Sequence, residues 1–131
     1  MFDQRMSLEE LEGRVSPHND FGSHVVQESQ RLRKLPVNQL TIEDLRLLIG
    51  QQIGLQFLVP IALDLLVINP LAQGAFYRGD LLANLLKLPP EFWQEHPQHN
   101  DTMVELGTEL KLIQETLADE LLPSIARFKY L

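Results

Sequence analysis

The chain has 131 residues, of which 44% are hydrophobic, and it carries a formal net charge of −7 and no cysteine. A chain of this length buries about 68% of its unfolded surface, so one domain with a real core is expected and wholesale disorder is excluded. The missing cysteines exclude disulfides, thiol chemistry and cysteine-ligated metals. The negative net charge argues against direct nucleic-acid binding and favours a basic protein partner.

Three positions in the first half of the chain carry an N-cap signal. They are Ser7, Ser23 and Thr41. These caps predict a short helix over residues 7–12, a helix over 24–34 and a helix that starts at 41, with a loop over 13–23. At the first and third positions an acidic residue stands three places further on, which completes a capping box.

The most hydrophobic stretch covers residues 47–68 and is long enough to cross a membrane. Glutamines, Pro60 and Asp64 interrupt it, and an aspartate near the bilayer centre costs about 2.5–3.5 kcal/mol. We therefore interpret it as buried helix that ends or kinks at Gly54. A second helix is predicted over 56–68, with Pro60 in or near its first turn.

The second half of the chain predicts further helices. A helix over residues 81–88 follows a turn at 74–79, and two prolines open a single helical turn over 89–93. Residues 97–100 are predicted to be a loop, and Asp101 is predicted to cap the last helix. One apolar stripe is expected to run along that last helix through Met103, Leu106, Leu110, Ile113, Leu117 and Leu121.

The last helix is expected to end or bend at Pro123, because proline lacks the backbone donor that a helix needs. No alternating pattern indicates a strand. The predicted fold is all-α, a single-domain irregular bundle of about six helices that spans residues 1–131.

Two histidines have a spacing that could hold zinc. His96 and His99 lie three residues apart, with Glu91 and Glu95 nearby as further ligands. Pro97 stands between the histidines and argues against a regular helix there. We interpret the segment as an exposed polar loop, and we expect no metal and no cofactor.

Asp64 is the one carboxylate that stands out as a candidate catalytic acid. Burial in its apolar helix would raise its pKa unless Arg46 or Arg78 met it. We interpret Asp64 as part of a polar stripe or of a core ion pair. The nucleophile-elbow, dinucleotide-binding and P-loop motifs are absent from the sequence, which gives no positive support for an enzyme.

Negative charge is concentrated late in the chain. Residues 91–120 contain eight acidic residues and one basic residue. Their net charge of −7 equals the net charge of the whole chain. Two like-charged pairs at helical spacing, Glu105/Glu109 and Glu115/Asp119, each cost a few tenths of a kcal/mol. A face that keeps such pairs would speed and orient the docking of a basic protein, and a merely solvated outer face is the alternative.

Two smaller groups of residues, one basic and one aromatic, also stand out in the sequence. The basic cluster Arg31, Arg33 and Lys34 is too small for a nucleic-acid footprint and is expected to pair with the acidic face or to aid solubility. The aromatic residues near turns are expected to cover the core, with an interface role as the alternative. They are Tyr77, Phe92 and Trp93.

Several spaced blocks occur in order along the chain: S-L-E-E-L-E-G at 7–13, L-P-V at 35–37, L-T-I-E-D-L-R-L-L-I-G-Q-Q-I-G-L at 40–55, L-V-P-I-A-L at 58–63, N-P-L at 69–71 and Y-R-G-D-L-L at 77–82. Together they resemble the immunity proteins of bacterial contact-dependent growth inhibition systems, over about residues 7–95. The chain departs from the family pattern at Arg78, where a proline is expected before Gly-Asp, and the departure affects the turn.

The resemblance implies a small, helical, non-enzymatic protein of the cytosol. Independently of the resemblance, the N-terminal residues lack the apolar segment of a secretory signal. Such a protein binds the C-terminal toxin domain of a cognate secreted effector and blocks it. The toxin is commonly a nuclease, and an acidic inhibitor can mimic phosphate and occlude a basic active site. No direct contact with nucleic acid or membrane is expected.

The matching blocks are mostly apolar, so we interpret them as scaffold rather than as binding residues. The predicted toxin-binding residues are Glu105, Glu109, Glu115 and Asp119. The exposed glutamines of other helices, Gln51, Gln52 and Gln56, are the alternative. Two other functions remain open: a helical adaptor or regulatory domain that binds another basic cytosolic protein, and a carboxylate-based hydrolase.

Overall fold

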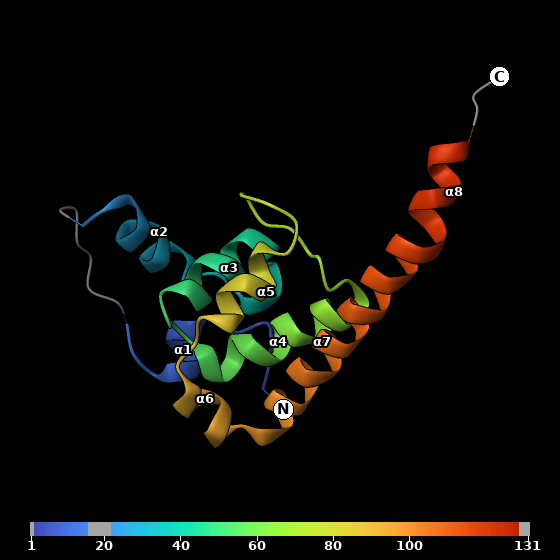
Figure 1. Cartoon of the computed structure of the whole chain (residues 1–131). Helices are drawn as coiled ribbons and strands as arrows, with labels where there is room; N and C mark the ends of the chain where they lie inside the picture. The colour runs from blue at the N-terminus through green and yellow to red at the C-terminus, as the bar shows by residue number, and fades with distance from the viewer. Residues whose placement is uncertain (1, 16–21, 129–131) are drawn as a thin grey trace.

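The computed structural model describes residues 2–15 and 22–128, which fold into helices without a β-strand. The predicted all-α bundle is confirmed. Figure 1 shows a body of packed helices and a last helix that crosses the body and then projects away from it. Part of the predicted loop over 13–23, residues 16–21, lies outside the described residues.

The helices keep the predicted order along the chain. Their bounds are α1 Leu8–Glu12, α2 His24–Leu32, α3 Ile42–Gly50, α4 Leu55–Ile68, α5 Asp80–Leu86, α6 Pro90–Glu95, α7 Pro97–Thr116 and α8 Leu122–Arg127, with a short 3-10 helix at Val37–Gln39 and a π turn at Leu117–Leu121. Since α7, the π turn and α8 follow one another without a break, we call residues 97–127 the C-terminal rod.

The predicted N-caps are confirmed in the first three helices. The side chain of Ser7 accepts the amide of Glu10, and the Glu10 carboxylate accepts the amide of Ser7, each at 3.2 Å. Thr41 and Asp44 make the same reciprocal pair at 3.1 and 2.9 Å. Ser23 caps α2 through a single bond. These bonds satisfy amides that would otherwise lack partners at the helix ends.

The core lies where α3, α4 and α5 meet, with α1, α2 and the first part of α7 packed around them. It is built mainly from leucine, and burying one such side chain fully contributes about 1.5–3 kcal/mol. The residues with no measurable exposure are Leu8, Leu32, Leu48, Ile49, Leu58, Val59, Ala62, Leu66, Leu81 and Leu85.

The long hydrophobic stretch is broken into two helices, as predicted, and no helix among the described residues is long and apolar enough to cross a membrane. The break covers residues 51–54: α3 ends at Gly50, and Gln52 and Gly54 both adopt the left-handed conformation, with φ of 57° and 63°, before α4 begins. Pro60 is the sixth residue of α4, so it lies in the second turn rather than the first.

Replacing Gly54 with alanine is expected to destabilise the fold by about 1–3 kcal/mol. A β-carbon there would stand 2.8 Å from both Cδ atoms of Leu8, which is fully buried, and the backbone conformation is itself strained for alanine. Urea denaturation would measure the loss. Gly107→Ala is the control, since a β-carbon there meets no atom within 4 Å; its stability should not fall.

The predicted loop at residues 97–100 and the predicted cap at Asp101 are wrong, because α7 already begins at Pro97. Proline is well suited to the first position of a helix, since its missing N–H would have no partner there and its φ is already helical. Asp101 is an exposed residue inside the first part of α7.

The predicted apolar stripe of the last helix faces the core over only part of its length. Leu106 is buried, and Met103 and Leu110 pack against the core. Leu117 and Leu121 are 40% and 49% exposed, because the helix has left the body by then (Figure 1). We call residues 117–128 the projecting segment.

Pro123 does not end the helix, since α8 continues to Arg127. In an unbroken α-helix the residue at 123 would donate to the carbonyl of Asp119, and proline has no donor. The wider π turn directly before α8 is where the chain accommodates this missing bond.

Candidate functional site

The four acidic residues singled out by the sequence all lie on the C-terminal rod. Glu105 and Glu109 belong to the part of α7 that crosses the body, Glu115 lies at its end, and Asp119 lies in the π turn. Asp119 lies fourteen positions after Glu105, which corresponds to about 21 Å along the helix at a rise of 1.5 Å per residue. One continuous element therefore carries all four carboxylates.

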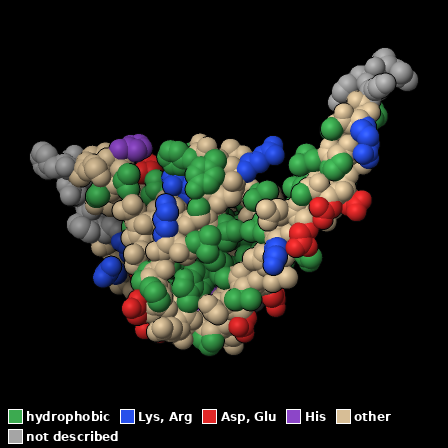
Figure 2. Space-filling view, viewed as in Figure 1, with side chains coloured by type: hydrophobic (Ala, Val, Ile, Leu, Met, Phe, Trp, Pro, Cys, Tyr) green, Lys and Arg blue, Asp and Glu red, His purple; other side chains and the backbone are tan. Residues whose placement is uncertain are grey.

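All four carboxylates are exposed. In residues 2–15 and 22–128 no ion pair or hydrogen bond engages these side chains, whereas Glu9, Glu12 and Glu43 in the body are each paired with a cation. Figure 2 shows acidic side chains along the outer edge of the projecting part of the rod and hydrophobic side chains on the edge turned toward the body. Their negative field is thus available to a partner.

Glu105 and Glu109 stand beside a cavity of about 400 Å³ between the rod and the end of α4. Its other lining is mostly apolar: Val67, Ile68, Pro70, Thr102, Leu106 and Ile113. Val67 and Ile68 are 62% and 84% exposed. A long basic side chain suits such a place, because its methylenes can lie on the apolar surface while its charge meets the carboxylates.

The loop between α4 and α5 is held by a residue that the sequence analysis placed only in the scaffold. Asp80 is 3% exposed, and its carboxylate accepts the amides of Gly74, Phe76 and Tyr77 at 2.6, 2.9 and 3.3 Å. Burial alone would raise the pKa of Asp80, but these hydrogen bonds and the charge of Arg46 hold it below its ordinary value.

A second carboxylate ties the same loop to α3. Glu43 accepts the amide of Ala75 at 2.7 Å and two hydrogen bonds from Arg46 at 2.6 and 2.7 Å. The Arg46 guanidinium lies 4.4 Å from the ring centre of Phe76. The hydrogen bond from Arg46 lowers the pKa of Glu43, and burial opposes it.

The result is a fixed loop that displays aromatic side chains. Phe76 and Tyr77 are 69% and 55% exposed, although the backbone amides of residues 74–77 donate hydrogen bonds to Asp80 and Glu43. Tyr77 was expected to cover the core, and this prediction is wrong. Phe92 and Trp93 do pack against the core, as predicted. The sequence signal for this arrangement was the acid that follows Gly79, at the start of an otherwise apolar helix.

The histidine pair does not form a metal centre. His96 Nδ1 lies 2.8 Å from the carbonyl oxygen of Phe92, and the rings of His96 and His99 stack at 5.5 Å. Burial, together with neighbouring His96, lowers the pKa of His99. Across the described ranges no three His, Asp or Glu side chains gather in a way that could hold a metal ion.

Asp64 does not form the predicted core ion pair. It is exposed on α4, and the candidate partner Arg46 is engaged by Glu43 instead. Exposure leaves Asp64 in the polar stripe that was the other interpretation.

The basic cluster pairs with the first two helices rather than with the acidic face. Arg33 meets Glu12 at 3.1 Å, Lys34 meets Glu9 at 2.5 Å, and Arg31 pairs with a neighbour on its own helix. The expectation that this cluster balances the late acidic residues is therefore wrong. It fastens α2 to α1, which leaves the acidic face without this counter-charge.

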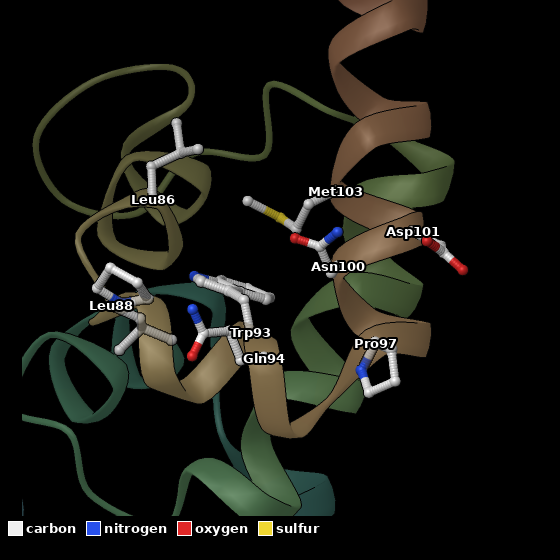
Figure 3. A pocket seen from close by; sticks show the side chains of 9 residues that line it. Leu86, Leu88, Trp93, Gln94, Pro97, Asn100, Asp101 and Met103 are labelled. Carbon is white, nitrogen blue, oxygen red and sulfur yellow. The ribbon is translucent and has the colours of Figure 1, made fainter.

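Two other surfaces of the body carry cavities. The glutamines Gln51, Gln52 and Gln56 are exposed, and the first two line a cavity of about 350 Å³ near α2. A cavity of about 620 Å³ lies between α6 and the start of α7, where Trp93 and Met103 face each other and Asp101 points away (Figure 3). Neither surface gathers charge as the rod does.

A family model described as CDI immunity proteins, where CDI stands for contact-dependent growth inhibition, matches residues 9–103. No curated protein and no solved structure matched the chain. The matched span runs from Glu9 in α1 to Met103 in the first part of α7, and it includes the Asp80 and Glu43 contacts that fix the loop. It ends before Glu105, so all four candidate acidic residues lie outside it.

Proposed function

Because the chain belongs to the CDI immunity protein family, whose members neutralise toxins, we propose that it binds its cognate toxin domain through the acidic C-terminal rod. The observation that carries this proposal is the set of four exposed carboxylates without a cationic partner in the described part of the chain. We further propose that the toxin domain is basic, that it is a nuclease and that binding takes place in the cytosol.

Electrostatics gives the rod two roles in this proposal. Its field raises the rate at which a positively charged toxin meets it in the right orientation. Its carboxylates then take the places that substrate phosphates occupy in a nuclease cleft, so that the rod blocks the substrate. A helix lying across a cleft can do so without chemistry of its own, and inhibition is stoichiometric.

Two features support placing the binding surface on the rod. The span that matches the family supplies nearly all of the buried core and the contacts that hold the loop, so changes at those positions would damage the fold. The acidic positions are exposed, so they can vary with the toxin at little cost to stability. A surface that distinguishes one toxin from another needs this freedom.

Co-expression with the toxin domain encoded immediately upstream of the gene tests the proposal. We expect growth to be rescued, and we expect a one-to-one complex with nanomolar affinity in calorimetry. Residual toxin activity should fall linearly to zero at one molar equivalent of the chain.

Active toxin together with no detectable complex would contradict the proposal and leave the adaptor function, with another basic protein as partner. Inactivation of many equivalents of toxin by one equivalent of the chain would instead indicate an enzyme.

A further inference from the structure

The projecting segment exposes an apolar face that the fold itself does not cover. Leu117, Leu121 and Ile125 are 40%, 49% and 63% exposed, and they follow one another at intervals of four residues. This spacing places them on one side of the helix. Leu122 and Phe128, at 57% and 64% exposure, widen the same apolar region.

This segment receives little support from the body. The packing of α8 is against the π turn that precedes it, and Figure 1 shows the segment pointing away from the other helices. A helix of about a dozen residues is only marginally stable in water without packing. Its apolar face is therefore suited to burial against another molecule.

The charge of the projecting segment distinguishes between a second copy of the chain and a basic protein as the molecule that buries this face. Glu115, Asp119 and Glu120 flank the apolar face, and Arg127 is the one cation among residues 114–128. Pairing two copies of the segment would bring six carboxylates together from chains that each carry a net charge of −7. A basic partner relieves this repulsion, so charge complementarity favours it over a second copy.

We propose that the projecting segment seats its apolar face in a hydrophobic groove of the basic toxin domain, as an amphipathic helix lies in a groove. This inference rests on the proposed function and assigns different roles to the acidic and the apolar residues of the rod. The acidic residues set the association rate, while Leu117, Leu121 and Ile125 set the lifetime of the complex.

The test replaces Leu121 and Ile125 with alanine in the full chain and measures toxin binding by surface plasmon resonance at several salt concentrations. Alanine favours helix, and both positions are exposed, so the fold is retained. We expect the dissociation rate to rise at least tenfold, with the association rate and its salt dependence within twofold of the unchanged chain. Val104→Ala is the matched control: Val104 is a 62% exposed residue on the same rod, over the body, and should leave both rates unchanged.

The possible results separate this inference from the proposed function. Normal toxin binding with unaltered dissociation in the Leu121 and Ile125 variants would overturn the inference and leave the proposed function intact. A lack of toxin binding by the unaltered chain would overturn both. Sedimentation that shows a dimer of the chain alone, lost in the same variants, would assign the face to a second copy and also overturn the inference.

Discussion

Replacing Glu105, Glu109, Glu115 and Asp119 with lysine is expected to weaken toxin binding by far more than tenfold at low salt. The change reverses the sign of the exposed face, so attraction of a basic toxin becomes repulsion along about 21 Å of helix. The screening length falls from about 30 Å at 0.01 M salt to about 8 Å at 0.15 M, so the loss should shrink as salt is added. Calorimetric titration at both salt concentrations measures it.

Lysine at all four positions preserves the two like-charged pairs, so the substitution changes the sign of the face with little effect on helix stability. A control is needed for net charge alone. Glu91→Lys with Glu95→Lys alters two exposed acids on α6 at the same spacing as Glu115 and Asp119. We expect the α6 pair to have a small effect and the Glu115/Asp119 pair a large one. Equal effects would show that net charge, rather than this face, governs binding.

Asp80→Asn is expected to cost about 1.5–3 kcal/mol of unfolding free energy, the range for hydrogen bonds to a charged group. The buried carboxylate accepts three amides of the loop, and an amide group in its place presents a donor toward them. The loss should appear in urea denaturation at pH 7. Asp101→Asn removes an exposed charge and should change stability by less than about 0.5 kcal/mol.

The same residue predicts how stability depends on pH. The pKa of Asp80 is lower in the folded chain than its ordinary value of 3.8, so the unfolded chain binds its proton first. This contribution is fully present above the unfolded pKa and is lost as pH falls through the folded pKa. The unaltered chain should therefore lose more stability than Asp80→Asn as the pH falls below about 5. Parallel pH dependence in the two proteins would show that Asp80 is not the group responsible.

Local signals predicted most of the fold because they act within a few residues. The capping boxes at Ser7 and Thr41 and the break at Gly54 depend on hydrogen bonds and backbone conformations that adjacent residues decide. The effect of a proline depends on its position in a helix, and adjacent residues do not fix that position. Pro97 begins a helix rather than interrupting a loop, and Pro123 follows a π turn within a continuing rod.

Long-range features could not be predicted from the sequence in the same way. The contact of Glu43 with Ala75 joins residues 32 positions apart, and no local pattern indicates it. The periodicity of the last helix correctly predicted an apolar stripe. It could not show that Leu106 is buried while Leu117 and Leu121 are exposed, because periodicity does not say what a face packs against.

Backbone hydrogen exchange of the chain, alone and with the purified toxin domain, tests the central claim most directly. Amides of a projecting helix exchange readily when nothing packs on it, and burial at an interface slows them. The account predicts that the toxin strongly protects the projecting segment and the end of α7, with little change at Gln51, Gln52 and α2. Protection confined to the body, with residues 117–128 exchanging as fast in the complex as alone, would contradict it.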